Sequence, residues 1–347
     1  MNEEQKYSVS VVVCTHNGAR TLDACCVSLE NQTLNKGSYE VIIVNDASTD
    51  STAEILSKHN VKIITNNSNK GLSVSRNIGI QNAQAQIIAF TDDDCVVSSD
   101  WLEKIVKGFE DIHVKGLGGN ILMGNKENTL LAKYIELNNP LQPLEMSLAK
   151  SNNILYRFYL YLLGTLGYTT SSNGKRQVFS LVGANMSFRR SVLEKLNYFD
   201  PLFTFGGDEE DLCKRFYMKQ SEGILMFDPD IEVKHNYNLE TKAFFKRYIG
   251  YGSGNARLFY KHKNHNLTLY PFPILILLLL LITLINNWFI FILVIAPLLF
   301  YFKWIIKAII GKSTIYLKFA YIQLATEFAI NLGLLKGLLM YKNLYKR

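Results

Sequence analysis

The sequence shows no signal-peptide pattern in its first residues, no paired cysteine motif and no glycine-rich phosphate loop. Its first residues, MNEEQKYSVSVVV, lack the basic and then apolar order of a signal peptide, so we expect the first domain to stay where it is made. The five cysteines form no CxxC pair and no zinc-type spacing with histidine, which argues against a disulfide framework and fits a reducing compartment. Neither GxxxxGKS/T nor GxGxxG occurs, which excludes the phosphate loops of P-loop and dinucleotide-binding proteins.

The formal net charge of +7 also restricts the class of partner. Lysine and arginine gather around and after the apolar C-terminal segment and form no single basic stripe along the chain. We therefore expect anionic lipid, and not nucleic acid, to be the partner of this charge. With 347 residues, 48% of them hydrophobic, the chain is long enough for an α/β core and an appended segment of different character.

Short apolar runs alternate with helix-like stretches over residues 9–91. The runs VSVVV, EVIIVN, VKIIT and QIIAFT predict strands, and the segments between them predict helices. This alternation indicates parallel strands joined by crossover helices, with both faces of the sheet covered. Ser51 and Glu54 have the spacing of a capping box at the start of the second helix.

Residues 125–177 lose this alternation, and we interpret them as an insertion or an acceptor-side segment. Within them, residues 154–168 form an apolar run that Arg157 interrupts and that is too short for a comfortable membrane span. A buried or interfacial helix is therefore favoured there over a crossing.

The strongest compositional signal is C-terminal, where two apolar runs cover residues 268–285 and 288–306. Each approaches the roughly 20 residues that a spanning helix needs, and the asparagine pair between them predicts a tight hairpin over about 268–306. Lysines flank both outer ends of this hairpin (Lys261, Lys263, Lys303, Lys307, Lys312). They predict that the flanks, and with them the catalytic domain, lie on the cytoplasmic side of a membrane. A buried soluble hairpin is the less favoured alternative.

A third apolar stretch covers residues 315–340 and contains Lys318, Glu327 and Lys336. If it crossed the membrane, the basic end KNLYKR would lie on the side opposite to the other lysines. An amphipathic helix on the membrane surface is therefore slightly favoured over a further crossing.

Polar side chains follow each of the four predicted strands, where ligands of open parallel sheets gather. They include Thr15 and Asn17 after the first strand, Asp46 after the second, and a group around Asn67 after the third that is also typical of a plain turn. Asp92, Asp93 and Asp94 follow the fourth strand. Because three adjacent carboxylates repel one another in a crevice, they predict a divalent cation, Mg²⁺ or Mn²⁺, that bridges a diphosphate; a solvated acidic loop is the alternative.

Two further segments carry chemistry. Arg76, with Lys70 before it, is available to meet a diphosphate, although a salt-bridge role is nearly as plausible for Lys70. The run FGGDEEDL at 205–212 opens a helix with several acids, which is typical of helix capping but, after two glycines, also of a carboxylate presented to an acceptor hydroxyl as general base.

Taken in order, these motifs resemble the inverting family 2 glycosyltransferases, which have the nucleotide-diphospho-sugar transferase (GT-A) fold. The resemblance runs over about residues 9–251. VSVVVCTHN resembles the first-strand signature, VIIVNDASTD the uracil-binding strand end, NKGLSVSRNIGI the Gly/Arg/Asn helix start, and FTDDDC the metal-binding DxD. GANMSFRR is similar to the acceptor-side strand, and FGGDEEDL stands where the catalytic Glu-Asp pair belongs.

The resemblance implies a role for each matching residue. Donor binding is expected from Thr15, Asn17, Asp46, Asn67, Arg76, Asp92 and Asp93, metal binding from Asp94 and His235, and acceptor-side contacts from Gly183 and Asn185. Glu209 would be the base, but the family pair reads Glu-Asp where this chain has Asp208 and Glu209, so Asp208 and Asp211 remain alternatives. A buried, hydrogen-bonded histidine is an equal alternative for His235.

The implied architecture has three parts: residues 1–124 as the nucleotide-sugar-binding half, 125–262 as the acceptor and catalytic half, and 263–347 as the membrane region. The implied activity is metal-dependent, inverting transfer from a UDP-sugar to a membrane-associated acceptor, such as a lipid-linked oligosaccharide in surface polysaccharide or glycolipid synthesis. Because the QxxRW motif of processive synthases is missing, one sugar is expected per encounter. A nucleotidyltransferase and a non-catalytic scaffold subunit of a polysaccharide assembly complex are the alternatives.

Overall fold

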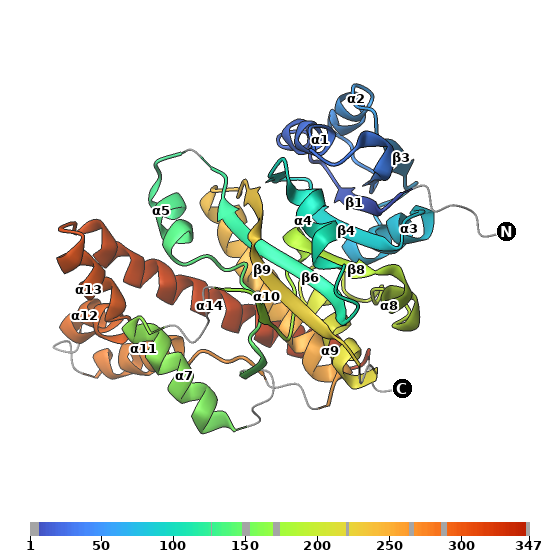
Figure 1. Cartoon of the computed structure of the whole chain (residues 1–347). Helices are drawn as coiled ribbons and strands as arrows, with labels where there is room; N and C mark the ends of the chain where they lie inside the picture. The colour runs from blue at the N-terminus through green and yellow to red at the C-terminus, as the bar shows by residue number, and fades with distance from the viewer. Residues whose placement is uncertain are drawn as a thin grey trace. The chain divides into compact units, whose positions relative to one another are not determined.

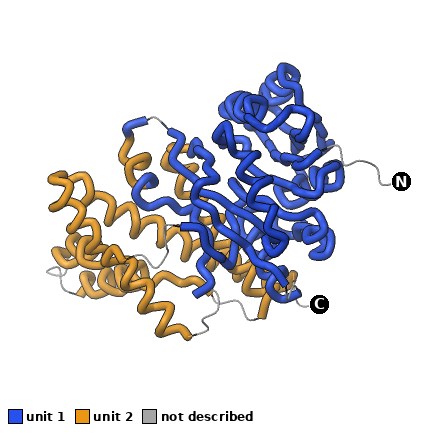
Figure 2. Tube along the Cα trace, in the orientation of Figure 1, with its two compact units in different colours: residues 1–128, 135–149, 172–237 blue, residues 129–134, 150–171, 238–347 orange. Residues whose placement is uncertain are grey.

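A computed structural model describes residues 7–125, 127–147, 153–168, 174–219, 222–263, 267–285 and 290–344. The chain divides into two compact units, coloured in Figure 2. Unit 1 comprises residues 1–128, 135–149 and 172–237, and unit 2 comprises residues 129–134, 150–171 and 238–347. The finer division into three functional parts stays a prediction.

The first half of unit 1 has the predicted strand and helix alternation (Figure 1). Its strands are β1 (Val9–Thr15), β2 (Tyr39–Asn45), β3 (Lys62–Thr65) and β4 (Ile87–Asp92), and its helices are α1 (Leu22–Glu30), α2 (Thr52–Leu56) and α3 (Leu72–Asn82). Strand β1 pairs in parallel with β2 and β4, and β2 pairs in parallel with β3. The parallel crossover arrangement is therefore confirmed.

The second half of unit 1 extends the same sheet with both parallel and antiparallel strand pairs. It adds β5 (Cys95–Val97), β6 (Val114–Met123), β7 (Arg176–Gln177), β8 (Met186–Arg189) and β9 (Ile224–His235). Strand β8 runs antiparallel between β4 and β6, β9 runs parallel to β6, and β5 and β7 pair antiparallel with β9. The strand order is β3-β2-β1-β4-β8-β6-β9-β5, so the α/β class is confirmed and the sheet is mixed.

Both faces of the sheet are covered because alternate strand residues point to opposite sides. Val11 and Val13 of β1 pack with α1 and with α4 (Trp101–Gly108) in one apolar core. Val12 packs in the other core with α3, α8 (Arg190–Lys195) and α9 (Asp208–Lys219). These two layers explain why the strands are near-continuous apolar runs. The described residues also include three shorter helical elements: two 3-10 helices (Lys36–Ser38, Gly183–Asn185) and α5 (Leu130–Leu137).

The predicted capping box at the start of α2 is wrong. Ser51 makes no side-chain capping bond. Instead Asp50 caps the helix, because its Oδ1 accepts from the Thr52 amide at 3.1 Å and from the Thr52 hydroxyl at 2.5 Å. An aspartate one residue earlier satisfies the same unpaired helix N–H groups, so the reciprocal bond from Glu54 is not needed.

Unit 2 is helical, and two of its helices pack with their backbones in close approach. A Cβ added to Gly252 of α10 (Thr241–Lys261) would lie 2.0 Å from the Ile330 carbonyl oxygen of α14 (Ile315–Tyr341). A Cβ on Gly333 would lie 2.0 Å from the Ile249 carbonyl oxygen, and one on Gly337 would lie 3.0 Å from the Ser253 carbonyl oxygen. Gly333 and Gly337 form a GxxxG pair, the spacing by which helices associate in membranes. Ile249 meets Gly333, Ser253 meets Gly337 and Arg257 meets Tyr341, and because this series advances together along both helices, α10 and α14 run parallel.

The predicted hairpin contains two helices that are shorter than a full crossing. Helix α11 (Pro271–Thr283) has 13 residues and α12 (Ile290–Phe300) has 11, below the roughly 20 that a straight span needs. The Phe272 ring stacks on that of Phe300 at 4.3 Å, so the start of α11 meets the end of α12, as in a hairpin. Helix α13 (Lys303–Ile310) follows α12 at a bend of 74°.

Among the described residues, α14 is the one unbroken helix long and apolar enough to cross a membrane, and the bent pair α12 and α13 passes the same test when taken together. Several polar side chains of α14 are buried and several of its leucines are exposed, which is the reverse of the usual burial in a helix in water. Gln323, Glu327 and Asn331 are buried, whereas Leu335 and Leu339 are 57% and 83% exposed. Lys318 and Lys336 are exposed, so the choice between a helix on the membrane surface and a further crossing stays a prediction.

The buried Glu327 is the centre of a polar cluster within unit 2. Its Oε2 accepts from the hydroxyl groups of Tyr161 at 2.8 Å and Tyr301 at 2.7 Å. Tyr161 belongs to α7 (Ile154–Leu166), which the sequence predicts as buried or interfacial. Ile154 and Leu155 of α7 are 79% and 74% exposed, so the buried alternative for this helix is wrong.

Candidate active site

The carboxyl ends of β1, β2 and β4 meet at one edge of the sheet. Residues paired in the parallel register there are Thr15 with Asn45 and Cys14 with Asp92. The loops that follow these strands are tied together, because the Asn17 amide donates to Ser48 Oγ at 2.9 Å and its side-chain oxygen accepts from the Thr49 amide at 2.8 Å. Asn17 has a φ of 58°, a left-handed conformation that asparagine tolerates better than most residues.

Asp46 is buried and holds the loop after β3. Its Oδ1 accepts from Asn66 Nδ2 at 2.8 Å and from the Lys70 amide at 2.9 Å, and its Oδ2 accepts from the Gly71 amide at 2.8 Å. These bonds use both carboxylate oxygens and fix the position of the loop. The neighbouring Asn67 is exposed at the same edge.

The three aspartates after β4 differ in their surroundings. Thr15 donates its hydroxyl to Asp93 Oδ2 at 2.5 Å, and Gly18 lies against the same carboxylate, since a Cβ there would be 2.2 Å from Asp93 Oδ2. Burial, together with the charges of Asp94 and Asp92, raises the pKa of Asp93 to about 7. A carboxyl group with this pKa is partly protonated near neutral pH.

Arg76 links the aspartates to α9. It is only 3% exposed, and its Nη1 donates to Asp208 Oδ2 at 2.5 Å while Nη2 lies 3.4 Å from Asp92 Oδ1. Gly183 makes room for this guanidinium group, because a Cβ there would lie 2.4 Å from Arg76 Nη2. Arg76 therefore pairs with two carboxylates from distant parts of the sequence, and its contact with a diphosphate stays a prediction.

Asp94 and His235 come together because β5 and β9 pair antiparallel. Cys95 lies opposite His235 in the register, and His235 Nε2 is 3.3 Å from Asp94 Oδ1. One donor atom each of Asp94, Cys95 and His235 lie within 4.8 Å of one another. Both residues predicted to bind metal are therefore neighbours.

This donor set fits a divalent cation. A carboxylate and an imidazole suit Mn²⁺, whereas Mg²⁺ prefers oxygen ligands alone. Burial and the charge of Asp94 raise the pKa of the Cys95 thiol well above its usual value, which disfavours the thiolate in the metal-free chain. Asp94 and His235 are the residues that would hold the ion, with open positions left for a diphosphate.

The first turn of α9 presents four acids, of which two are ion-paired. Asp208 is 1% exposed and pairs with Arg76, and Asp211 is buried and pairs with Arg215 at 2.8 Å. Glu209 is partly exposed. Its burial, together with the charge of Asp208, raises the pKa of Glu209 well above its usual value.

The glycines before α9 explain how its first turn is presented. Gly206 and Gly207 have φ values of 74° and 84°, which residues with a side chain rarely adopt. The chain can therefore turn sharply into the helix immediately before Asp208. This is the structural reason for the pair of glycines in FGGDEEDL.

Asn185 has a structural position in the core. Its Nδ2 donates to the carbonyl groups of Asn120 at 3.0 Å and Ile231 at 2.9 Å, and its Oδ1 accepts from Trp101 Nε1 at 2.9 Å. These bonds join β6, β9 and α4 behind the aspartates. Asn185 therefore positions the strands, and its predicted contact with the acceptor stays untested.

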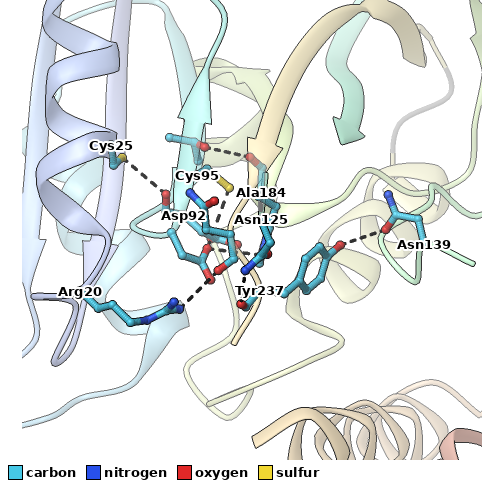
Figure 3. A network of polar contacts seen from close by, with 12 residues as sticks. Arg20, Cys25, Asp92, Cys95, Asn125, Asn139, Ala184 and Tyr237 are labelled. Carbon is cyan, nitrogen blue, oxygen red and sulfur yellow. Dashed lines mark hydrogen bonds and ion pairs between the residues drawn. The ribbon is translucent and has the colours of Figure 1, made fainter. Parts of the chain in front are cut away.

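Sequence reasoning missed several polar residues around the Asp94 and His235 pair, which Figure 3 draws in part. The exposed Arg20 brings Nη2 to 3.5 Å from the Asn236 carbonyl oxygen. Tyr237 lies 4.2 Å from His235 between ring centroids and donates its hydroxyl to Asn139 Oδ1 at 3.0 Å. Asn125 donates to the Tyr237 carbonyl at 2.9 Å. Asn125 and Asn139 lie in the segment without periodicity, so no local pattern pointed to them.

Fold and site together are those of the nucleotide-sugar transferase class of enzymes: an acidic edge at the carboxyl ends of parallel strands, with a candidate cation site and a partly exposed carboxyl group. The sequence profile of Glycosyl transferase family 2 matches residues 10–196, and that of Glycosyl transferase family group 2 matches residues 140–306. Since the first match covers more than half of the chain, the protein belongs to glycosyl transferase family 2 and is a glycosyltransferase.

Similar curated proteins agree with this family. Glycosyltransferase AglE of Haloferax volcanii is 33% identical over 118 residues, which is 33% of this chain and 39% of that protein. The cholesterol galactosyltransferase of Borreliella burgdorferi is 40% identical over 102 residues, 28% of each chain. An uncharacterized glycosyltransferase, EpsJ of Bacillus subtilis, is 26% identical over 69% of this chain and 64% of its own length. The matches thus span well under half of the first two relatives.

Two solved structures share the fold. The mannosyltransferase PcManGT from Pyrobaculum calidifontis, solved with GDP-Man and Mn²⁺, superposes with a TM-score of 0.56 at 17% identity and covers 94% of this chain and 86% of its own. GalNAc-T7, solved with UDP, GalNAc and Mn²⁺, has a TM-score of 0.53 at 18% identity and covers 76% and 52%. At this identity the likeness establishes the GT-A fold.

Proposed function

We propose that this glycosyltransferase moves a sugar from a UDP-sugar to an acceptor hydroxyl by one direct, Mn²⁺-assisted displacement that inverts the anomeric centre. One observation carries the proposal. His235 Nε2 and Asp94 Oδ1 lie 3.3 Å apart just after the carboxyl end of β4, while in the described part of the chain Asp208 and Asp211, but not Glu209, form ion pairs with arginine. Metal-binding and base functions are thus divided between two acidic clusters of one unit.

Asp94 and His235 would hold the cation. When bound, Mn²⁺ neutralises the negative charge that develops on the diphosphate as it leaves. The two solved structures with the same fold were both solved with Mn²⁺. For this chain, the donor set of Asp94 and His235 is what supports the choice of Mn²⁺. Arg20, exposed in the loop after β1, is placed to add a second positive charge on the diphosphate.

Glu209 is the proposed general base. Its raised pKa gives a stronger base than an ordinary glutamate once it is ionised. It accepts the proton of the acceptor hydroxyl as that oxygen bonds to the anomeric carbon, and the bond from that carbon to the diphosphate breaks. Asp208 and Asp211 are the weaker alternatives, because Arg76 and Arg215 already hold their carboxylates.

Donor recognition is proposed for the strand ends Thr15, Asn17, Asp46, Asn67 and Asp93. Asp46 would act by fixing the loop that meets the base, since three donors already bind its two oxygens. Asn67 is exposed and free to contact the nucleoside directly. The uridine preference rests on the likeness of VIIVNDASTD to the uracil-binding strand end.

Unit 2 is proposed to hold the enzyme at the cytoplasmic face of a membrane, so that the acceptor is membrane-associated and lipid-linked. The reversed sides of α14 support this, because a helix with Glu327 inside and leucines outside suits a hydrocarbon environment. The GxxxG packing of α10 and α14 supports it too. The lysines around α11 to α13 favour the cytoplasmic orientation.

Release of nucleotide from a panel of UDP-, GDP- and dTDP-sugars by the detergent-solubilised chain, with and without Mn²⁺, tests the proposal. We expect one UDP-sugar to be hydrolysed slowly in Mn²⁺ and not in chelator, since water replaces the missing acceptor. Release from a GDP- or dTDP-sugar would overturn the uridine assignment alone. Absence of release and of binding for every donor would overturn the catalytic proposal in favour of a scaffold subunit.

A further inference from the structure

An apolar groove of about 410 Å³ lies wholly within unit 2, between α10, α11 and α14. Its lining includes Phe245 and Ile249 of α10, Pro273 and Ile276 of α11, and Phe328 and Leu332 of α14. A groove of this volume falls in the range of small-molecule sites, but it lacks the convergent polar groups that orient a polar ligand. The chemistry of the lining therefore selects a hydrocarbon.

The groove is bounded by rigid elements. The glycine contacts between α10 and α14 continue directly from the groove, because Ile249 lines it and its carbonyl oxygen also meets Gly333. Tyr321, at the other end of the lining, donates its hydroxyl to the Val294 carbonyl oxygen of α12 at 2.6 Å. The groove is thus fixed by backbone packing at one end and by a hydrogen bond at the other.

Two exposed lysines mark one end of the groove. Lys242 lies one turn before Phe245 on the same side of α10, and Lys318 lies one turn before Tyr321 on the same side of α14. Because α10 and α14 run parallel, both lysines lie on the N-terminal side of the lining residues of their helix, and with Ile249 beside Gly333 the register places Lys318 further toward that end than Lys242. Neither makes an ion pair with any other residue in the described part of the chain. An apolar slot with two cations at one end is complementary to an alkyl chain that ends in a phosphate.

We propose that this groove binds the hydrocarbon chain of a phosphate-bearing lipid acceptor, with the phosphate near Lys242 and Lys318. The role of this lipid as the sugar acceptor rests on the proposed function, whereas the binding site itself rests on the groove and its lysines. Binding in the groove would select a lipid by its chain length and by its charge. General contact of unit 2 with a bilayer would discriminate neither property.

The test uses the full chain in nanodiscs and a dodecyl phosphate that carries a diazirine at its chain end. After photolysis, we expect mass spectrometry to find the label on groove residues of α10 and α14. Excess dodecyl phosphate should remove most of the label, and butyl phosphate should need an at least about 100-fold higher concentration, because it buries fewer methylene groups. Label spread evenly over the exposed leucines of α11 and α14 would overturn the proposal.

Matched variants separate the groove from the surface. Ala325→Phe fills the groove and should lower labelling by about tenfold, whereas Leu339→Phe, on the exposed side of α14, should leave it unchanged. If Ala325→Phe lowers the melting temperature, Ile276→Trp fills the groove from α11. Equal labelling of the groove in the filled and unfilled chains would contradict the proposal.

The charge arm uses Lys242→Gln with Lys318→Gln, and Lys263→Gln as the control. The double variant should bind the phosphate probe less tightly and dodecanol as before, and the control should match the original chain. If the double variant lost as much affinity for dodecanol as for the phosphate probe, the proposed phosphate contact would be refuted.

Donor hydrolysis distinguishes failure of this inference from failure of the proposed function. Groove variants should keep water-driven hydrolysis of the donor while their KM for a lipid phosphate acceptor rises. Loss of the groove label with hydrolysis intact would count against the groove alone, and labelled groove residues without any hydrolysis would count against the transferase proposal alone.

Discussion

Removal of the Arg76 side-chain charge should destabilise unit 1 strongly. Arg76→Met leaves Asp208 buried without its partner, whereas Asp92 keeps access to water because about a third of its side chain is exposed. Loss of one partner of a buried ion pair costs about 3–5 kcal/mol. For a domain of this size, a loss of that order lowers the melting temperature by roughly 6–20 °C.

The charge argument is tested by a second variant and by pH. Arg76→Met with Asp208→Asn removes the stranded charge and leaves an unsatisfied amide, so the loss should shrink to about 1–3 kcal/mol. In Arg76→Met, the buried carboxyl group of Asp208 has lost its cation, and burial of an unpaired carboxyl group disfavours the charged form. The stability deficit should therefore be smallest in acid and grow as pH rises.

The thermal assay can follow unit 1 alone. All five cysteines belong to unit 1, and four of them, Cys25, Cys26, Cys95 and Cys213, are buried. A thiol-reactive dye that fluoresces on reaction therefore reports the temperature at which this unit opens. The same melting temperature for Arg76→Met and for the double variant, with no dependence on pH between 5 and 8, would refute the account of Arg76 as a charge link.

Three further predictions follow from the same structure. Glu209→Gln should lower kcat by about 10²–10⁴ with donor affinity kept, and the pH profile of the original chain should rise with a midpoint above the ordinary glutamate pKa, because the base must ionise; a profile flat from pH 5 to 8 would contradict this. Gly183→Ala should cost about 1–3 kcal/mol and lower activity by displacing Arg76, as thermal melting and initial rates would measure; unchanged values would show that the guanidinium can shift freely. Gly333→Leu should prevent monodisperse purification, whereas exposed Leu335→Val should not, and equal gel-filtration profiles would refute the close packing of α10 and α14.

The sheet of the first half was predictable because its information is local. Each strand from β1 to β4 is a short apolar run followed by a polar turn, and the crossover helices fill the intervals. The mixed second half was not predictable in this way. The segment without periodicity separates β6 from β8 and β9, and the order of these strands in the sheet depends on pairings between residues far apart in the chain.

The candidate site follows the same division. Thr15, Asp46 and the three aspartates could be placed at one sheet edge from strand ends alone. The pairing of Arg76 with Asp208 could not, because 132 positions separate them and their meeting depends on how α3 and α9 cover the sheet. His235 was identified through the family resemblance, and its position beside Asp94 depends on the register of β5 with β9.

In helix α14, the burial of Glu327 could not be predicted from the pattern of charged and apolar residues. Lys318, Glu327 and Lys336 in an apolar run suggested an amphipathic helix, and Lys318 and Lys336 are exposed. Glu327 is instead buried between the hydroxyl groups of Tyr161 and Tyr301, which come from α7 and from the chain directly after α12. A partner supplied by distant helices cannot be read from the period of one segment.

The central claim is that Asp94 and His235 hold the cation that binds the donor diphosphate. Its most direct test is the affinity of UDP for the solubilised chain with and without Mn²⁺, measured by calorimetry for the original protein, for Asp94→Asn and for the exposed control Asp100→Asn. We expect Mn²⁺ to tighten UDP binding in the original chain and in Asp100→Asn, and to have little effect in Asp94→Asn. If Mn²⁺ tightens UDP binding equally in all three chains, Asp94 does not bind the metal and the account of this site is wrong.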